Sequence, residues 1–210
     1  MSKPPAPSSP AGVPRPFFHD AYQEQSNAPW DIGRPQPAFV ELEEAGQITG
    51  SVLDIGCGTG ENALYLASRG HTTSGVDMVE TAIARAREKA RARGLEATFR
   101  VADALLLESL HETFDTLIDS GLFHVFGDPE RLRFVESLRA ALRPGGVYHL
   151  LCFSDAEPPG LGPRRVSEGE IRATFAEGFQ VRAIVPHRYE TRIHQGGSAR
   201  AWLASIQRDR

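Results

Sequence analysis

Residues 51–60 read Ser-Val-Leu-Asp-Ile-Gly-Cys-Gly-Thr-Gly, and the rest of the chain is organised around this run. Its first five residues are an apolar segment that favours a β-strand, and glycines follow at positions 56, 58 and 60. Asn62–Arg69 then has apolar residues at helical spacing. A strand, a glycine turn and a helix in this order are typical of a nucleotide-binding βα unit. Glycine suits such a turn because it lets the chain reverse sharply while a ligand approaches the backbone.

The spacing of these glycines differs from that of a dinucleotide-binding fingerprint. That fingerprint reads Gly-x-Gly-x-x-Gly and holds a pyrophosphate at the helix N-terminus. Here Glu61 stands where the third glycine would fall. Its carboxylate would repel a pyrophosphate, but it could accept hydrogen bonds from a positively charged ligand. Asp54, just before the turn, adds a second acid. The spacing therefore disfavours a nicotinamide-dependent oxidoreductase, which we keep as the alternative from another class.

The run from Val52 to Gly60 resembles the first motif of the class I S-adenosylmethionine (SAM)-dependent methyltransferases. In that family the turn holds the amino-acid end of SAM, and the ligand carries an ammonium and a sulfonium in place of a pyrophosphate. The resemblance covers roughly Gly33–Gln207 and implies the class I methyltransferase fold. A protein that binds SAM without catalysis would share the same motif, so this second alternative stays open.

Composition limits the class of protein. The 210 residues carry a net charge of −4, and 40% of them are apolar, which suits one domain with a sizeable core. No basic block indicates nucleic-acid binding, and Cys57 and Cys152 show no metal-ligand or disulfide spacing. We find neither a signal-peptide core nor a window of about 18 apolar residues. We therefore expect a cytoplasmic, soluble protein, with a monomer favoured and with no metal, nucleic-acid or membrane partner.

Apolar runs alternate with helical patterns along the chain. This alternation predicts an α/β fold with a doubly wound, mostly parallel, seven-stranded sheet that is Rossmann-like and ends in an antiparallel hairpin. The expected strands are Ser51–Ile55, Thr72–Val76, Ala97–Val101, Phe114–Asp119, Val147–Phe153, Phe179–Tyr189 and Ala199–Gln207. The expected helices are Pro37–Ala45, Asn62–Arg69, Thr81–Arg93, a helix capped by Asp128 that runs to Leu142, and one opened by the capping box Ser167-x-x-Glu170. The helix after Asp128 is expected to bury Leu132, Val135, Leu138 and Leu142.

The N-terminal region divides into two predicted parts, ahead of a methyltransferase domain at 47–210. Met1–Pro16 holds six prolines and is predicted to be a disordered tail. Residues 17–46 are predicted to form a lid and a helix over the core. The alternative is a helix that is merely packed by its aromatic residues. A lid is favoured because Trp30-Asp31-x-Gly33-Arg34 combines a flat apolar surface, an acid and a fixed cation.

Acids at strand ends extend the predicted cofactor site. Asp77 follows the second strand, some twenty residues after the glycine turn, where an acid can hold both ribose hydroxyls. Met78 can lie against the adenine, and the family uses a side chain at the position of Asp103 to bond the adenine amino group. Asp103 also fits a helix N-cap. The cofactor-binding residues that the resemblance implies are Trp30, Asp54, Gly56, Cys57, Gly58, Thr59, Gly60, Asn62, Asp77, Met78, Ala102, Asp103, Ala104, Asp119 and Ser120.

The segment Asp119–His124 follows the fourth strand, close to where the transferable methyl group should lie. His124 is the candidate catalytic base, because an imidazole with an ordinary pKa of about 6.5 suits proton removal at neutral pH. The alternative is that His124 only orients the substrate. The expected acceptor-binding residues are Phe17, Phe18, Tyr22, Arg34, Phe123, His124, Phe126 and Phe153. The Pro- and Gly-rich loop Ser154–Val166 is predicted to complete the lid. Tyr189 is expected in the core, and His194 is given no role.

Two further resemblances concern the acceptor. Pro29-Trp-Asp-x-Gly-x-x-x-Pro37 resembles an N-terminal motif of the thiopurine and halide/thiol methyltransferase group. Trp30–Pro37 and Asp119–His124 also resemble stretches of bacterial methyltransferases that modify heterocyclic and hydroxyquinolone-like compounds. The resemblances imply in-line transfer of a methyl group from SAM to a small aromatic or heterocyclic acceptor, which leaves S-adenosylhomocysteine. O-methylation of a hydroxyl is the first expectation. The alternative is S- or N-methylation of a thiol or heterocycle, or transfer to a halide.

Overall fold

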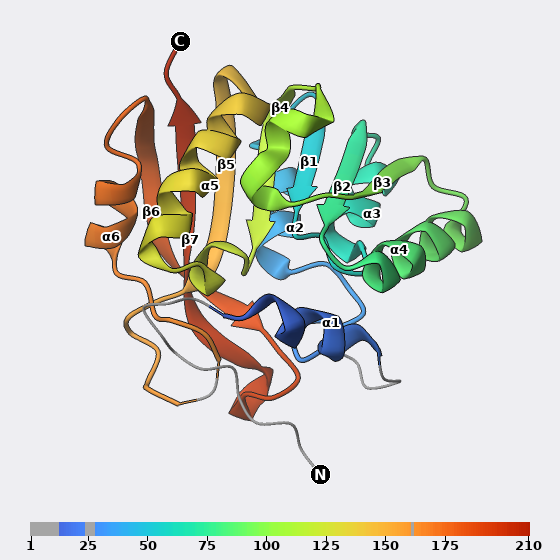
Figure 1. Cartoon of the computed structure of the whole chain (residues 1–210), viewed down its shortest axis with the longest axis horizontal. Helices are drawn as coiled ribbons and strands as arrows, with labels where there is room; N and C mark the ends of the chain where they lie inside the picture. The colour runs from blue at the N-terminus through green and yellow to red at the C-terminus, as the bar shows by residue number, and fades with distance from the viewer. Residues whose placement is uncertain (1–12, 24–27, 161) are drawn as a thin grey trace.

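A computed structural model of the chain describes residues 13–23, 28–160 and 162–210. These residues form one sheet of seven strands in the order β3-β2-β1-β4-β5-β7-β6 (Figure 1). The strands from β1 to β5 run parallel, and β7 lies antiparallel between β5 and β6. The strands are β1 (Val52–Ile55), β2 (Thr73–Asp77), β3 (Ala97–Val101), β4 (Phe114–Ser120), β5 (Leu142–Phe153), β6 (Phe179–Glu190) and β7 (Ser198–Arg208). The predicted, mostly parallel, seven-stranded sheet with a terminal antiparallel hairpin is confirmed.

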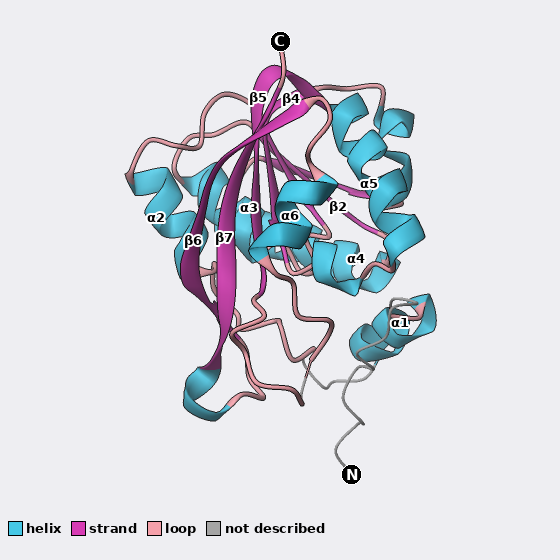
Figure 2. Cartoon of the chain, turned by 90° about the vertical axis from the view of Figure 1, so that its left-hand side faces the viewer, coloured by secondary structure: helices cyan, strands magenta, loops and turns pink. Residues whose placement is uncertain are grey.

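Helices cover both faces of this sheet (Figure 2). The α-helices of the described residues are α1 (Arg15–Gln23), α2 (Pro37–Glu44), α3 (Glu61–Ser68), α4 (Glu80–Arg93), α5 (Asp128–Ala141) and α6 (Glu168–Thr174). Three short 3₁₀ segments in the same residues are η1 (Ala104–Leu110), η2 (Phe123–Val125) and η3 (Gln195–Gly197). In the described part of the chain, no helix is both long and apolar enough to span a membrane.

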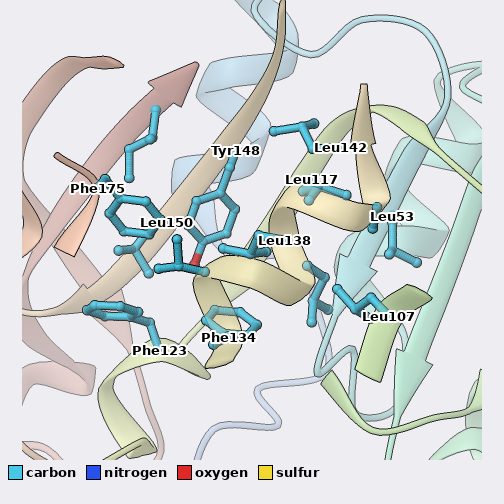
Figure 3. Close-up of a cluster of buried hydrophobic side chains, with 14 of the residues drawn as sticks. Leu53, Leu107, Leu117, Phe123, Phe134, Leu138, Leu142, Tyr148, Leu150 and Phe175 are labelled. Carbon is cyan, nitrogen blue, oxygen red and sulfur yellow. The ribbon is translucent and has the colours of Figure 1, made fainter. Parts of the chain in front are cut away.

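The main core lies between the sheet and the α5 side of the molecule (Figure 3). Leu53, Leu117 and Leu150 from three strands are fully buried there against Phe134 and Leu138 of α5. The opposite face of the sheet packs on α2 and α3. Strands that are buried on both faces read as continuous apolar runs, which explains why the short parallel strands were predictable from the sequence.

Helix α5 differs from its prediction in two respects. Its N-cap is Gly127, and Asp128 is the first helical residue, whose carboxylate pairs with Arg164. Leu132, predicted to be buried, is 68% exposed. Phe134 takes its place in the apolar stripe with Val135 and Leu138, and this stripe faces the sheet while Leu132 lies outside it.

Two predicted boundaries also move. Strand β5 begins at Leu142 rather than Val147, because Leu142 already pairs with Phe114 before the register shifts. Helix α1 begins at Arg15, inside the predicted tail, and the Val13 N–H donates to the Val125 carbonyl at 2.8 Å. The predicted disorder of residues 1–12 lies outside the described residues.

Leu138 and Leu132 form a matched pair on one helix. We expect Leu138→Ala to lower the free energy of unfolding by about 2–5 kcal/mol, because the substitution removes fully buried atoms and leaves a cavity. Leu132→Ala should change it by no more than about 0.5 kcal/mol. Urea denaturation of both variants measures the difference, and equal losses would contradict this packing.

Candidate functional site

The glycine turn after β1 has the backbone that the sequence predicts. Gly56, Gly58 and Gly60 have φ values of 69°, 54° and 85°, a region that side chains disfavour. Gly60 is also the N-cap residue of α3. A Cβ atom built on Gly58 would lie 2.6 Å from the Tyr22 hydroxyl. The turn therefore needs glycine both for its conformation and for the close approach of α1.

Two buried carboxylates, Asp54 and Asp119, and a partly buried one, Asp77, lie at the carboxyl edge of the sheet beside this turn. Asp77 accepts hydrogen bonds from Gly58 N and Val79 N, each at 2.9 Å, so it holds the turn in place. Asp119 accepts from two backbone N–H groups and, at 2.8 Å, from the Tyr148 hydroxyl. Asp54 accepts from Ala63 N at 3.2 Å, and its other oxygen is buried without a hydrogen-bond partner.

The surroundings of these carboxylates favour their neutral form or a positively charged ligand. Burial raises the pKa of Asp54 to about 8 and that of Asp119 to about 7, and it also raises the pKa of Asp77. Within the described chain, no Lys or Arg side chain hydrogen-bonds to any of the three. Because a buried charge without a counter-charge is costly, a cationic ligand at this edge would be stabilised.

Aromatic residues of the N-terminal region gather around Trp30. The rings of Phe17, Phe18 and Tyr22 lie 6.0, 5.9 and 6.1 Å from the Trp30 ring. Trp30 Nε1 donates to the Tyr22 hydroxyl at 2.7 Å, and Arg85 of α4 donates to the Tyr22 carbonyl at 2.9 Å. Helix α1 is thereby fixed beyond the carboxyl ends of β1 and β2 (Figure 1).

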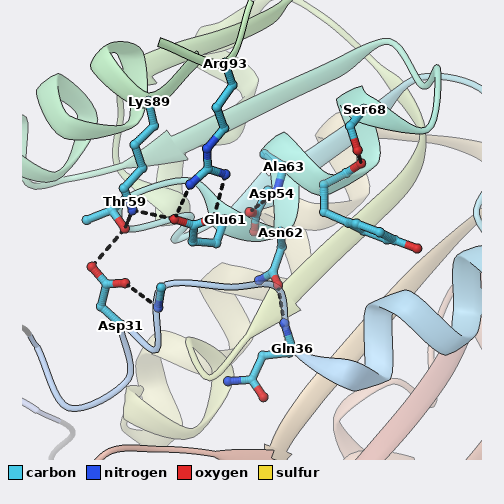
Figure 4. Close-up of polar contacts among 12 residues, drawn as sticks. Asp31, Gln36, Asp54, Thr59, Glu61, Asn62, Ala63, Ser68, Lys89 and Arg93 are labelled. Carbon is cyan, nitrogen blue, oxygen red and sulfur yellow. Dashed lines mark hydrogen bonds and ion pairs between the residues drawn. The ribbon is translucent and has the colours of Figure 1, made fainter. Parts of the chain in front are cut away.

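A polar network clamps the segment after Trp30 to the glycine turn (Figure 4). The Thr59 hydroxyl donates to Asp31 at 2.9 Å and accepts from Lys89 at 2.7 Å. Lys89 and Arg93 also form ion pairs with Glu61 at 2.7 and 2.8 Å. The idea that Glu61 accepts hydrogen bonds from a ligand is therefore wrong, because α4 already neutralises its carboxylate.

Gln36 connects three parts of the chain next to this network. Its backbone N–H donates to Asn62 Oδ1 at 2.9 Å, and its side chain exchanges two hydrogen bonds of 2.9 Å with the Glu190 backbone. Arg34 pairs with the Glu190 carboxylate at 2.7 Å and stays 59% exposed. These contacts of Arg34 and Gln36 thus fix the segment of the predicted lid that follows Trp30 to α3 and β6.

A cavity of about 670 Å³ opens between the N-terminal region and the carboxyl edge of the sheet. The predicted site residues that line it are Phe17, Phe18, Tyr22, Trp30, Gly56, Asp77, Met78, Ala102, Asp103, Ala104, Ser120, His124, Phe126 and Phe153. A smaller cavity of about 50 Å³ beside the glycine turn is lined by Arg34, Cys57, Gly58, Thr59 and Asn62, among others. Arg34, predicted to bind the acceptor, is therefore absent from the lining of the large cavity. Asp54, Gly60, Asp119 and Phe123 line neither cavity.

Phe123 points into the core rather than toward a ligand. Its ring lies 6.0 Å from that of Phe175 (Figure 3). The Arg131 guanidinium lies over the same ring, 4.4 Å from its centroid. Its predicted acceptor-binding role is wrong because Asp119 accepts from the backbone N–H groups of Leu122 and Phe123 and so fixes the tight turn. In that turn, Leu122 and His124 line the cavity and Phe123 faces away.

His124 is held as a neutral hydrogen-bond donor. It is buried, and its Nδ1 accepts from the Phe153 backbone N–H at 3.0 Å, so the proton resides on Nε2. Burial, aided by Arg131 and Arg165, lowers the pKa of His124 to about 3. A group in this state has no free lone pair for a substrate proton. The geometry thus supports the alternative role of an orienting donor over that of a general base.

Sequence reasoning missed residues that the hairpin of β6 and β7 brings to the cavity. Tyr189, Thr191 and His194 all line it. Tyr189 is buried as predicted, yet its hydroxyl reaches the Ser120 carbonyl at 3.2 Å. Gly162 and Pro163, from the loop predicted to complete the lid, also line the cavity. No local pattern identifies Thr191 and His194, because their position depends on the pairing of distant strands.

Comparisons with known proteins agree with this arrangement. A family model for a methyltransferase domain matches residues 52–146. A 2-heptyl-1-hydroxyquinolin-4(1H)-one methyltransferase of Mycobacteroides abscessus is 43% identical over 79% of this chain and 74% of its own length. A probable thiol methyltransferase 2 of Arabidopsis thaliana is 30% identical over 81% of this chain and 82% of its own length. A solved structure described as "Conversion of a Disulfide Bond into a Thioacetal Group during Echinomycin Biosynthesis" is 42% identical, with a TM-score of 0.83 and 92% of each chain covered.

The bond from Phe153 to His124 gives a stability prediction. We expect His124→Ala to lower the free energy of unfolding by about 1–3 kcal/mol beyond the loss of packing, because it leaves a buried N–H group unpaired. His124→Asn keeps an acceptor near the position of Nδ1 and should lose less. Urea denaturation at pH 7.5 compares the two variants. An equal loss would mean that this hydrogen bond does not stabilise the fold.

The lowered pKa of His124 gives a second prediction. The unfolded chain, with an ordinary histidine pKa of about 6.5, takes up this proton before the folded chain does. The contribution of His124 to stability is therefore complete above that pH and is lost as the pH falls toward 3. We expect the wild type to lose more stability than His124→Asn between pH 6.5 and 4.5. Parallel curves of unfolding free energy against pH would refute this assignment.

Proposed function

We propose a reaction for this chain, which belongs to the class I SAM-dependent methyltransferases. It transfers the SAM methyl group to a small aromatic or heterocyclic acceptor, and a hydroxyl oxygen is the favoured nucleophile. The observation that carries this proposal is a cavity that extends from Asp77 and Asp103 at the carboxyl edge of the sheet to an aromatic end at His124 and Phe153.

The carboxylate end of the cavity fits SAM. The left-handed glycines let the ligand approach the backbone, and Asp77 stands at the end of β2, where ribose hydroxyls can reach its carboxylate. Met78 and Asp103 line the same end and suit the adenine. Asp77 and Asp103 place carboxyl groups at this end of the cavity, whose described lining holds no Lys or Arg, and this suits the positive charge of the ligand. When bound, SAM supplies an electrophilic methyl group on a sulfonium.

The chain itself contributes orientation and the exclusion of water. Trp30 and its aromatic neighbours cover the cofactor end, and the Asp31–Thr59 hydrogen bond holds them there. Residues of the predicted lid thus border cofactor and acceptor alike. Holding two reactants in line, away from water, supplies much of the rate enhancement that a displacement requires. His124 adds a fixed hydrogen-bond donor at the acceptor end.

The chemistry of the lining supports an uncharged, flat acceptor. Phe126, Phe153 and Tyr189 present aromatic walls, and Ile193 stands at the rim. None of the described residues that line the large cavity is Lys or Arg, so no cation is placed there to hold a carboxylate or phosphate. The relative at 43% identity is named for a hydroxylated quinolone, which fits such walls. The thiol methyltransferase among the relatives supports S-methylation as the second candidate.

Three lesser assignments accompany this proposal. We infer action in the cytoplasm, because both cysteines are free and buried, as befits a reducing compartment. We keep the proposed lid and helix up to residue 46 and the methyltransferase domain at 47–210, but the tail predicted at 1–16 is shortened because α1 begins at Arg15. A monomer that acts on a small molecule, without nucleic acid, is the proposed working form. The oxidoreductase alternative is withdrawn, because relatives that match most of the chain are methyltransferases.

Calorimetry with SAM and S-adenosylhomocysteine, followed by a screen of small aromatic hydroxyls and thiols, tests the proposal. We expect both ligands to bind the wild type, and Asp77→Asn to weaken SAM binding by about 1–3 kcal/mol through the loss of charged hydrogen bonds. Asp209→Asn, near the C-terminus, is the control and should bind as the wild type does. Binding without methyl transfer to any acceptor would indicate a SAM-binding protein instead. Unchanged affinity in Asp77→Asn would remove Asp77 from the ribose site.

A further inference from the structure

The loop between β6 and β7 is fixed over the acceptor end of the cavity. Thr191 N donates to the Gly197 carbonyl and Gly197 N to the His194 carbonyl, each at 2.9 Å, so the loop closes on itself. Arg192 N donates to the Pro29 carbonyl at 2.9 Å, and the Arg192 guanidinium bonds to the Asp31 carbonyl. The loop is therefore tied to the lid segment, and its side chains have defined positions.

His194 is the titratable residue that this loop brings to the cavity. Its side chain is only 9% exposed, and its ring packs edge-on against Phe153 with centroids 5.3 Å apart. Nδ1 lies 2.8 Å from the Thr191 hydroxyl, whereas Nε2 is buried with no hydrogen-bond partner. Because leaving a buried polar atom unpaired is costly, this nitrogen is suited to a polar atom of a ligand.

A carboxylate stands beside the unpaired nitrogen. Glu157 Oε1 is 4.0 Å from His194 Nε2, and the other Glu157 oxygen accepts from Arg200 N at 2.7 Å, which holds the carboxylate in place. The guanidinium groups nearby are engaged elsewhere: that of Arg192 bonds to Asp31, and that of Arg200 donates to the Ala156 carbonyl at 2.9 Å. Arg165 lies over the Phe153 ring at 5.5 Å. Glu157 thus places a carboxylate 4.0 Å from Nε2, where a negative charge would stabilise an imidazolium.

We propose that His194 is the base that accepts the proton of the acceptor's hydroxyl or thiol, an inference that rests on the proposed methyl transfer. In the tautomer that serves this role, Nδ1–H donates to Thr191 and the lone pair of Nε2 is free. The acceptor O–H bond breaks and an N–H bond forms on Nε2. The oxygen then bonds to the methyl group while the sulfur keeps the electron pair of its broken bond to carbon. The imidazolium, stabilised by Glu157, later releases its proton to solvent.

The two cavity histidines therefore have opposite roles. His124 is committed to the Phe153 N–H through Nδ1 and can only donate, while His194 retains an unpaired nitrogen next to a carboxylate. Both pack on the Phe153 ring, at 4.9 and 5.3 Å. An acceptor that lies along this ring would receive a hydrogen bond from His124 and donate one to Nε2 of His194.

Acceptors of different acidity test the proposal. The hydroxylated acceptor from the screen is compared with a ring-fluorinated analogue whose hydroxyl is already ionised at the assay pH. We expect His194→Ala to lower kcat for the un-ionised acceptor by about 10²–10⁴-fold and to leave kcat for the ionised analogue and the Kd of SAM nearly unchanged. Glu157→Gln should act in the same direction but less. His187→Ala is the control, because His187 pairs with Glu41 at 3.1 Å and lines neither cavity.

Equal losses with both acceptors would make His194 a wall of the cavity, and no loss with either would refute its role outright. A second measurement needs no turnover. With S-adenosylhomocysteine present, 4-nitrophenol bound below its own pKa should show the phenolate absorbance band in the wild type but not in His194→Ala. Bound neutral phenol in the wild type, or no binding, would overturn the proposal. A phenolate band without methyl transfer to any acceptor would support the base and instead contradict the proposed function.

Discussion

The placement of Asp54, Asp77 and Asp119 at one edge of the sheet, with Asp54 and Asp119 buried and Asp77 partly buried, is the constraint on which the site depends. Carboxylates without counter-charges are costly inside a protein, and here backbone N–H groups offset only part of that cost. One of those N–H groups, that of Gly58, belongs to the turn of left-handed glycines after β1. Of the three, Asp77 lines the large cavity, where we propose that a cationic ligand offsets the remaining cost.

Aromatic residues border much of the cavity. Trp30 and its neighbours line the end beside Asp77, and their attachment to the glycine turn runs through Asp31 and Thr59. At the other end, burial keeps the His124 side chain neutral, so it acts as a hydrogen-bond donor, while Nε2 of His194 has no hydrogen-bond partner. In the proposed reaction, the methyl donor and the acceptor would meet in this cavity, where few groups compete with either, and this favours displacement at a methyl group.

The sequence indicated the features that depend on neighbouring residues. The glycine turn, the acid after β2 and the alternation of strands and helices follow from local periodicity and turn chemistry, and the structure contains them. Features that depend on contacts between segments far apart in the sequence could not be predicted. Glu61 is neutralised by Lys89 and Arg93 from another helix, and His194 reaches the cavity only because β7 inserts between β5 and β6. The predicted orientations of the Phe123 and Leu132 side chains were wrong, because each depends on how its element is rotated about its own axis, which apolar spacing does not define.

The central claim is that this carboxylate edge is built for a positively charged cofactor, and proton release on SAM binding tests it most directly. Burial raises the pKa of Asp54, and that of Asp77 in the lining of the large cavity, above their ordinary values, so a cation bound at this edge favours the loss of a proton from these carboxyls. Calorimetry of SAM binding at pH 7, in two buffers with different heats of ionisation, measures this proton. We predict tight binding with net proton release. Absence of binding, or binding with no change in protonation, would contradict the account.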